Sequence, residues 1–281
     1  MREGISVKIA RRARLSASSA ALWGVDKVSY RLGLRNAAKL TLPDFLGLGA
    51  QKAGSSWLWA NLRCHPDLYL PAGKELHYFN LYFYSSLASY AAQFEGGTGK
   101  LKGEITPAYS ILDPPKIRFV RQIMRHVKLI LILRNPIDRA WSRAKMVLSE
   151  PGDKEIDVKA FSRQHLLRAL ADPSSRARSD YLTIIDNWRE HFPKEQLHIC
   201  FFEDLTQRPK EFLTAIFAFL GVRSDVDWGM FPFEKSPNPT PPTTIPPQYR
   251  QLLEEMYCPQ IEGLYERFGG KVEAWRCGKN A

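Results

Sequence analysis

The sequence predicts a three-layer α/β fold around a central parallel sheet, and three observations support it. Short apolar runs alternate with helical segments, which is the order expected for a parallel sheet covered by helices. The run 127–133 (VKLILIL) is apolar on both faces, as in a central parallel strand. The run 44–50 (DFLGLGA) ends in glycines and leads into a helix, which indicates a strand–loop–helix unit.

The individual elements follow from apolar spacing and from proline and glycine positions. His65-Pro66 ends the first helix, Pro136 suits the first turn of another, and Gly269-Gly270 ends the last. The expected strands are 44–50, 102–106, 127–133 and 197–202, and the expected helices are 55–64, 116–127, 136–148, 180–191, 209–220 and 248–268. The proline-rich stretch 231–247 is expected to be an irregular loop.

The chain divides most simply into a basic N-terminal arm, residues 1–40, and a single domain, residues 41–281. The sequence of 281 residues has a net charge of +11, which predicts an anionic ligand or surface. Nine basic and two acidic residues give the arm +7 of this total, so the domain itself is not expected to bind nucleic acid. The arm fits either a solvated leader or a peripheral membrane contact, and both interpretations stay open.

The lengths of the apolar runs and the spacing of the cysteines indicate the cellular compartment. No apolar run approaches the roughly 18 residues of a membrane-spanning helix. The four cysteines, Cys64, Cys200, Cys258 and Cys277, include no C-x-x-C pair and give metal binding little support. We therefore expect a cytoplasmic protein in a reducing compartment, with membrane association through the arm as the open alternative.

The stretch 47–62 (GLGAQKAGSSWLWANL) looks like a phosphate-binding loop whose lysine is displaced. Gly49 and Gly54 have the glycine spacing of the G-x-x-x-x-G-K-[ST] loop, and Ser56 stands where its hydroxyl residue belongs. Ser55 occupies the usual lysine position, and Lys52 lies inside the loop instead. Because the loop joins a strand to a helix, the amides at the helix start are expected to point at an anion.

A second strand-to-helix loop, 133–144 (LRNPIDRAWSRA), follows the most apolar strand. Arg134 stands at the carboxyl end of that strand, where parallel sheets bind ligands, and Ser142 follows inside the helix. Together they predict a second phosphate site, and an Arg134–Asp138 pair at the helix start is the alternative. Two separated anion sites, with no acidic residue at a strand end to hold Mg²⁺, argue against a Mg-nucleoside triphosphate.

Taken together, QKAGSSW and RNPIDRAWS resemble the motifs of sulfotransferases that use 3′-phosphoadenosine 5′-phosphosulfate (PAPS). The resemblance covers about residues 45–222. It implies the P-loop-NTPase-like fold of that family, transfer without a metal, and adenosine 3′,5′-bisphosphate (PAP) as product. It also implies that Lys52 stabilises the negative charge that develops on the leaving 5′-phosphate. It places the 5′-phosphate on Ala53, Gly54, Ser55 and Ser56, and the 3′-phosphate on Arg134 and Ser142.

Two aromatic residues match positions that contact adenine in cytosolic members of the family. Trp57 follows the two loop serines, and Phe202 ends the expected strand 197–202. The resemblance implies that both touch the nucleotide base. For Trp57, packing on the first helix is an equal alternative.

A third motif, AGKELHYFN (72–80), resembles glycan sulfotransferases of the heparan sulfate type. It implies that Glu75 is the catalytic base, which takes the proton from an acceptor hydroxyl or amine. His77 would support Glu75 or accept the proton itself, and Lys74 would face the sulfuryl oxygens. Tyr181 matches a position on the substrate side. A surface charge cluster is the alternative interpretation of the motif.

The chain departs from the glycan branch in two places. Ile105 stands where related enzymes often carry a lysine, which argues against a polyanionic, heparan-like acceptor. The glycine- and basic-rich loop near the family's C-terminus is replaced by the proline-rich stretch. Lys235 and Arg250 are the candidates there for a further contact with the 3′-phosphate.

The main hypothesis is a metal-independent, PAPS-dependent sulfotransferase whose acceptor is a saccharide or a glycolipid. A small-molecule kinase of the phosphate-loop type, which would use Mg-ATP, is one alternative. A non-catalytic protein that binds a membrane surface is another. The sequence leaves the acceptor and the oligomeric state open.

Overall fold

The computed structural model describes residues 40–83, 85–149, 161–234 and 244–278. The basic arm, apart from Leu40, and Lys235 of the proline-rich stretch lie outside these ranges. The first described residues lead directly into the sheet, whose first strand begins at Phe45.

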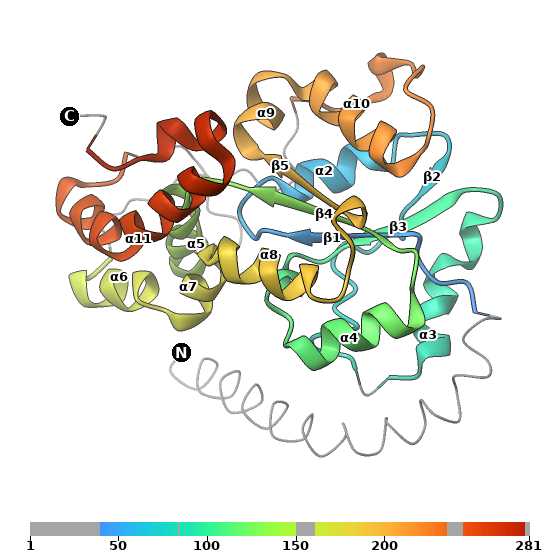
Figure 1. Cartoon of the computed structure of the whole chain (residues 1–281), viewed down its shortest axis with the longest axis horizontal. Coiled ribbons are helices and arrows are strands. Elements are labelled where there is room, and N and C mark those ends of the chain that lie inside the picture. The colour runs from blue at the N-terminus through green and yellow to red at the C-terminus, as the bar shows by residue number, and fades with distance from the viewer. Residues whose placement is uncertain (1–39, 84, 150–160, 235–243, 279–281) are drawn as a thin grey trace.

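A parallel sheet lies at the centre of the molecule (Figure 1). Within the described ranges it has five strands in the order β2-β3-β1-β4-β5, and the paired strands are all parallel. Their bounds are β1 Phe45–Gly49, β2 Leu68–Tyr69, β3 Leu101–Ile105, β4 Lys128–Leu133 and β5 Leu197–Phe201. The predicted three-layer α/β fold with a parallel sheet is confirmed.

Helices cover both faces of the sheet. α2, α9 and α10 lie on one face and α4 and α8 on the other, while α5, α6, α7 and α11 gather toward one end of the molecule (Figure 1). The bounds are α2 Ser55–Leu62, α3 Leu87–Ala91, α4 Pro114–Ile123, α5 Pro136–Leu148, α6 Arg163–Leu170, α7 Pro173–Ser179, α8 Tyr181–Arg189, α9 Phe202–Gln207, α10 Pro209–Leu220 and α11 Pro247–Phe268. Among the described residues, no helix is both long and apolar enough to span a bilayer.

The two strands that matter most for the site are fully buried. β1 is buried along its whole length, and in β4 the residues from Leu129 to Leu133 are at most 1% exposed. The pairing of β1 with β4 shifts register between Gly47 and Gly49, just where the chain leaves the sheet for the first loop. α5 starts with Pro136 in its first turn, and the Asn135 side chain accepts the Ile137 amide at 2.9 Å.

The sequence analysis expected Phe202 to end a strand, but in the structure Phe202 begins α9. The strand stops at Phe201, and the chain turns directly into the helix. The two-residue strand β2 and the helices α3, α6, α7 and α9 were not predicted. Each of these helices has eight residues or fewer, too few to show a clear helical period in the sequence.

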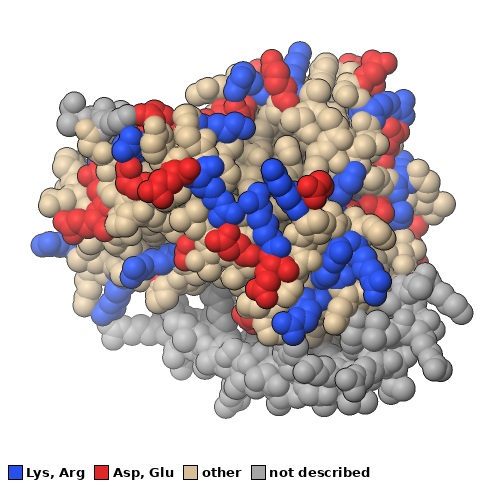
Figure 2. Space-filling model, in the orientation of Figure 1, with Lys and Arg blue, Asp and Glu red and all other residues tan. Residues whose placement is uncertain are grey.

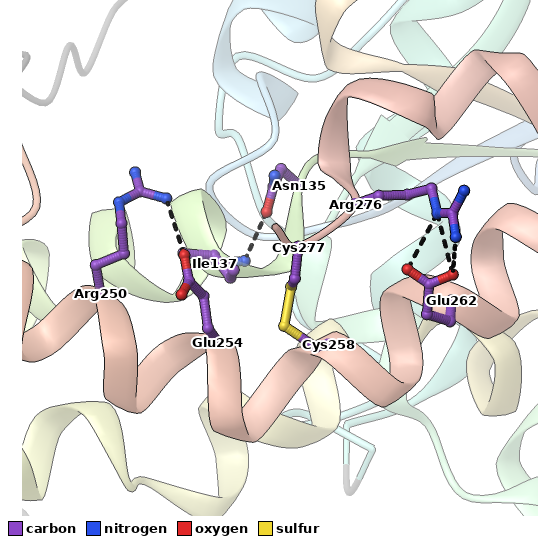
Figure 3. The surroundings of a disulfide bond; sticks show 8 residues. All are labelled: Asn135, Ile137, Arg250, Glu254, Cys258, Glu262, Arg276 and Cys277. Atoms are coloured by element: carbon purple, nitrogen blue, oxygen red, sulfur yellow. Dashed lines mark hydrogen bonds and ion pairs between the residues drawn. A yellow bond between two sulfur atoms is a disulfide. The ribbon is translucent and has the colours of Figure 1, made fainter. Parts of the chain in front are cut away.

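Two cysteines form a disulfide, which the sequence analysis did not expect. Cys258 of α11 is bonded to Cys277, with 5.9 Å between the Cα atoms (Figure 3). The bond ties the segment after Trp275 back to α11, and the Arg276–Glu262 ion pair at 2.9 Å joins the same two parts. Cys64 and Cys200 are free. Disulfides persist in oxidising compartments, so the cysteines no longer support a reducing one.

Candidate active site

The first loop leaves β1 in a conformation that requires glycine at defined positions. Gly49 and Gly54 have φ of 122° and 88°, and Lys52 between them has φ of 68°. A Cβ atom added to Gly49 would lie 2.9 Å from the Pro107 carbonyl oxygen, so space as well as φ demands glycine there. The loop therefore turns sharply between β1 and α2, as its resemblance to a phosphate loop predicted.

The start of α2 can accept an anion. Gly54 occupies the N-cap position without a side chain to cap the helix, and the first turn contains no acidic residue. The first amides of a helix have no partner within it, and the helix dipole adds positive charge at this end. Ser55 is buried and Ser56 is half-buried at these positions, so both hydroxyls belong to the loop that encloses the helix start.

Arg134 connects the two predicted phosphate loops. Its Nη1 donates a hydrogen bond of 2.8 Å to the carbonyl oxygen of Lys52, and its guanidinium lies 4.5 Å above the ring of Phe202. Its backbone amide donates to the hydroxyl of Tyr181 at 3.4 Å. Arg134 therefore lies at the carboxyl end of β4 while it holds the loop that follows β1.

Positive charge converges on Lys52. The pKa of Lys52 is lowered to about 8, first by burial and then by repulsion from four cations, in decreasing order Arg134, Lys145, Lys74 and Arg143. Figure 2 shows basic and acidic side chains interspersed over the visible surface. The cluster around Lys52 is thus a local concentration of positive charge, and an anion bound there would relieve the repulsion.

Two of these cations were missed by the sequence analysis. Lys145 lies one turn beyond Ser142 on α5 and is only 4% exposed, and Arg143 pairs with Asp172 at 3.2 Å. Ser142 itself is 5% exposed. The three-residue spacing from Ser142 to Lys145 puts both on one side of α5, a signal that the sequence contained.

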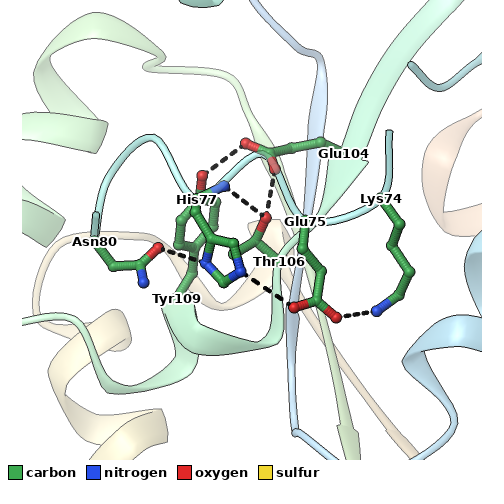
Figure 4. Close-up of polar contacts among 7 residues, drawn as sticks. All are labelled: Lys74, Glu75, His77, Asn80, Glu104, Thr106 and Tyr109. Atoms are coloured by element: carbon green, nitrogen blue, oxygen red, sulfur yellow. Dashed lines mark hydrogen bonds and ion pairs between the residues drawn. The ribbon is translucent and has the colours of Figure 1, made fainter. Parts of the chain in front are cut away.

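A second polar cluster contains Glu75 and His77 (Figure 4). Glu75 Oε2 lies 3.3 Å from His77 Nε2, and the other carboxylate oxygen is ion-paired with Lys74. His77 Nδ1 lies 3.1 Å from Asn80 Oδ1, so Asn80 holds the opposite side of the imidazole. The three residues predicted from AGKELHYFN are brought together, with side chains 16–34% exposed.

Glu75 and His77 shift each other's pKa. Burial alone would raise the pKa of Glu75, but hydrogen bonds from His77 and Lys74 outweigh it and lower the pKa to about 2. The hydrogen bond to Glu75 raises the pKa of His77 against the opposing effect of burial. Glu75 and His77 also have φ of 65° and 56°, a conformation that costs non-glycine residues on the order of 1–3 kcal/mol each.

Two other predicted site residues, Tyr181 and Trp57, are buried and make contacts within the protein. Tyr181 is 0% exposed, and burial raises its pKa to about 12. Its hydroxyl accepts a hydrogen bond from the Arg134 backbone amide, and its contact with substrate stays a prediction. Trp57 is 5% exposed, packs against Phe212 and Phe233, and donates to the Phe233 carbonyl oxygen at 2.8 Å.

The contacts of Trp57 with Phe212 and Phe233 agree with the alternative interpretation, that Trp57 is a packing residue. Its contact with adenine stays a prediction. Phe202 is partly buried beneath Arg134 and close to Gly54, so its contact with adenine also stays a prediction. Arg250 is about half exposed and pairs with Glu254 at 3.8 Å (Figure 3), and nothing in its contacts assigns it to a phosphate.

The fold and site together define a class of protein: a parallel α/β domain with a phosphate-type loop, a second basic loop beside it, and an acid–base pair nearby. The sequence profile of the sulfotransferase domain matches residues 42–227. The chain therefore belongs to the sulfotransferase domain family. This confirms the family assignment that the motifs predicted.

Individual relatives agree with the family. The membrane-associated sulfotransferase kil1 of Dictyostelium discoideum is 25% identical, in an alignment that covers 68% of this chain and 58% of kil1. Human heparan sulfate glucosamine 3-O-sulfotransferase 3B1 is 28% identical over 69% of this chain and 50% of its own length. The crystal structure of a sulfotransferase from Alicyclobacillus acidocaldarius matches with a TM-score of 0.64 and 25% identity, covering 83% of this chain and 98% of that one.

The chain spans about half the length of the curated relatives that it matches. The family match, which extends from residue 42 to residue 227, includes both phosphate loops and the Glu75–His77 motif.

Proposed function

We propose that this domain transfers a sulfuryl group from PAPS to a hydroxyl or amine of a saccharide or glycolipid. The observation that carries the proposal is the convergence of cations on the loop around Lys52, next to the Glu75–His77 pair. The cations around Lys52 suit a ligand with two separated phosphates. The Glu75–His77 pair suits an acceptor that must lose a proton.

The residues of the first loop fit the phosphosulfate end of PAPS. The open helix start at Gly54 and the buried Lys52 supply amides and positive charge to an anion. PAPS, when bound, supplies the activated sulfuryl group and a nucleotide phosphate as leaving group. Lys52 would stabilise charge on the leaving oxygen, while Arg134, Ser142 and the newly identified Lys145 would hold the 3′-phosphate.

Glu75 and His77 act on the acceptor in this proposal. As the acceptor oxygen or nitrogen bonds to sulfur, its proton must move to a nearby base. A carboxylate with a pKa near 2 is a weak base, and the Lys74 ion pair is one reason for the low value. Movement of Lys74 toward the sulfuryl oxygens would free Glu75 to accept the proton, with His77 as its partner.

The type of acceptor is narrowed by Ile105. This residue is 1% exposed and a Cβ atom added to Gly47 would meet it at 2.7 Å, so the position is filled by an apolar contact with β1. A lysine charge is absent at this position. The support for an acceptor of low negative charge is the resemblance alone, because related glycan enzymes often carry a lysine at this position; a saccharide or glycolipid of this kind is proposed over a highly sulfated polymer.

We also propose that the basic arm 1–40 makes a peripheral contact with a membrane. The support is the arm's positive charge and the similarity to kil1, a membrane-associated sulfotransferase. The cytoplasmic location expected from the cysteines has lost its basis, because Cys258 and Cys277 are bonded.

Two measurements test the proposal. Calorimetric titration in EDTA should show tight binding of PAP and weak binding of ATP, and adding Mg²⁺ should not reverse that order. Transfer of ³⁵S from labelled PAPS should then be screened over unsulfated glycosaminoglycan, neutral glycolipid and simple phenol acceptors. Preference for Mg-ATP would overturn the cofactor assignment, and transfer to phenols alone would overturn the saccharide assignment.

A further inference from the structure

A buried carboxylate, Glu104, lies next to the Glu75–His77 loop (Figure 4). Glu104, on β3, is 2% exposed, and the sequence analysis gave it no role. Its Oε1 accepts from the hydroxyls of Tyr90 at 2.6 Å and Tyr109 at 2.9 Å. Its Oε2 accepts from the Thr106 hydroxyl at 2.7 Å, and the backbone amide of Leu76 donates to the same carboxylate.

The donors on Glu104 determine the direction of each hydrogen bond. Burial raises the pKa of Glu104, and the hydrogen bonds from three hydroxyls and one backbone amide oppose that rise, because this set of donors is complementary to the ionised carboxylate. Since the single hydroxyl hydrogen of Thr106 is directed at Glu104, the Thr106 oxygen can only accept on its other side. It accepts there from the backbone amide of His77 at 3.4 Å.

The chain of contacts leads from the sheet to the loop. Thr106 is 0% exposed, and its backbone amide donates to the Gly47 carbonyl oxygen of β1 at 3.0 Å. Leu76 and His77 are therefore fixed, through Glu104 and Thr106, to the same strand that carries the phosphate loop. Glu75 lies between Lys74 and Leu76 and takes its orientation from this stretch.

We propose that Glu104 and Thr106 are positioning residues that hold the Glu75–His77 pair in register with the phosphate loop. The positive φ of both Glu75 and His77 means that this backbone relaxes elsewhere unless neighbouring groups hold it. The two amides held by Glu104 and Thr106 are the backbone groups of the two residues that follow Glu75. The catalytic consequence rests on the proposed function, but the geometry does not.

The first test needs no substrate. Thr106→Val keeps the shape of the side chain and removes the hydroxyl, and Thr106→Ser restores the hydroxyl. Ser110→Ala is the matched control, because the buried Ser110 hydroxyl bonds to the Pro107 carbonyl instead, at 3.0 Å. NMR of ¹³C-labelled histidine, with His77 assigned by His77→Gln, reports whether the imidazole still pairs with Glu75.

In Thr106→Val we expect the pKa of His77 to fall toward the ordinary value of 6.5, while Thr106→Ser and Ser110→Ala keep the raised value. Thr106→Ala repeats the test if the valine variant does not fold. An unchanged His77 titration in a folded variant without the hydroxyl overturns the proposal, whatever reaction the protein performs.

The second test uses the reaction. Misplacing a catalytic pair by about 1 Å can cost roughly 10²-fold in rate, so we expect single-turnover sulfuryl transfer to fall by about that factor in Thr106→Val. Glu104→Gln should fall similarly. PAP affinity should stay within about threefold of wild type in both. Equal losses in rate from Ser110→Ala would show a general structural effect and contradict a positioning role.

Discussion

At the scale of single residues, replacing Arg134 or Ser142 distinguishes a direct contact with the 3′-phosphate from support of the loop that carries Lys52. Both are predicted to touch the 3′-phosphate, but Arg134 also donates to the Lys52 carbonyl oxygen. A hydrogen bond to a charged group contributes about 1.5–3 kcal/mol, or roughly 10- to 150-fold in affinity. We expect Ser142→Ala to weaken PAP binding within that range and Arg134→Ala to weaken it more, with a smaller effect of either on the chemical step.

Calorimetry with PAP and with adenosine 5′-monophosphate distinguishes these roles. Loss of the 3′-phosphate contact should appear with PAP alone, whereas disturbance of the Lys52 loop should weaken both nucleotides. Wild-type PAP affinity in both variants would contradict the two-site assignment.

Glu75 and Lys52 should fail in different ways when replaced. Glu75→Gln keeps the shape but cannot take a proton, and losing a general base typically costs about 10²–10⁴-fold in rate. Lys52→Ala removes charge from the anion site both before and during bond breaking, so it should lower PAP affinity as well as turnover. Single-turnover rates beside PAP dissociation constants make the comparison. A Glu75→Gln enzyme at wild-type speed would transfer the role of base to His77.

The lowered pKa of Lys52 leads us to expect that Lys52 takes up a proton when PAP binds. Its pKa near 8 means that about half of the molecules are deprotonated there at pH 8. A bound phosphate favours the charged form and raises the pKa, so PAP binding at pH 8 should take up to about half a proton from buffer. Calorimetry at pH 8 in buffers of different ionisation enthalpy measures the uptake, because the PAP phosphates, with a second pKa of about 6, are already almost fully ionised at that pH. Proton release, or no change in Lys52→Arg relative to wild type, would contradict this assignment.

At the scale of elements, the disulfide fixes the end of the chain to α11. Cys258 and Cys277 are 19 residues apart, and closing a loop of that size stabilises a fold by about 3 kcal/mol. We expect Cys258→Ser, or reduction with dithiothreitol, to lower the melting temperature by several degrees. Cys64→Ser is the control, because that cysteine is free and partly exposed. If reductant leaves the melting curve unchanged while thiol titration shows four free cysteines, the bond does not form.

The sequence was most informative where local signals and burial coincide. α5 and α10 begin and end at the predicted residues, because proline opens each of them and apolar spacing continues to the last turn. The phosphate loop was predictable because its glycines are required by backbone conformation, and that requirement is local.

Contacts between distant parts of the chain were not predictable in this way. Tyr181 matched a family position but is buried behind Arg134, and only the packing of α8 against the sheet reveals that. Glu104 looked like an ordinary strand residue, since its donors come from Tyr90, Thr106, Tyr109 and Leu76. The bond between Cys258 and Cys277 required knowing that the chain turns back after α11.

At the scale of the whole molecule, the basic arm and the domain should be separable. The sheet begins at Phe45 and the family match at residue 42, whereas the arm carries +7 of the total charge of +11. Deletion of residues 1–38 should leave a folded domain that binds PAP like the full chain. It should abolish binding to vesicles containing anionic lipid at low salt, as sedimentation would show. An insoluble truncated protein would place the arm in the core.

The bond from Arg134 to the Lys52 carbonyl gives the site a property that neither loop has alone. On the proposed assignment, the two loops are anion-binding points joined at a fixed separation and would behave as a bidentate receptor. Binding of one phosphate would then raise the effective concentration of the other by an amount set by the ligand's own length. A nucleotide with phosphates on both the 3′ and 5′ oxygens gains this advantage, and inorganic phosphate or a singly phosphorylated nucleotide does not. Selection among the abundant adenine nucleotides of a cell would then follow from the spacing between the two loops, with little demand on recognition of the adenine base.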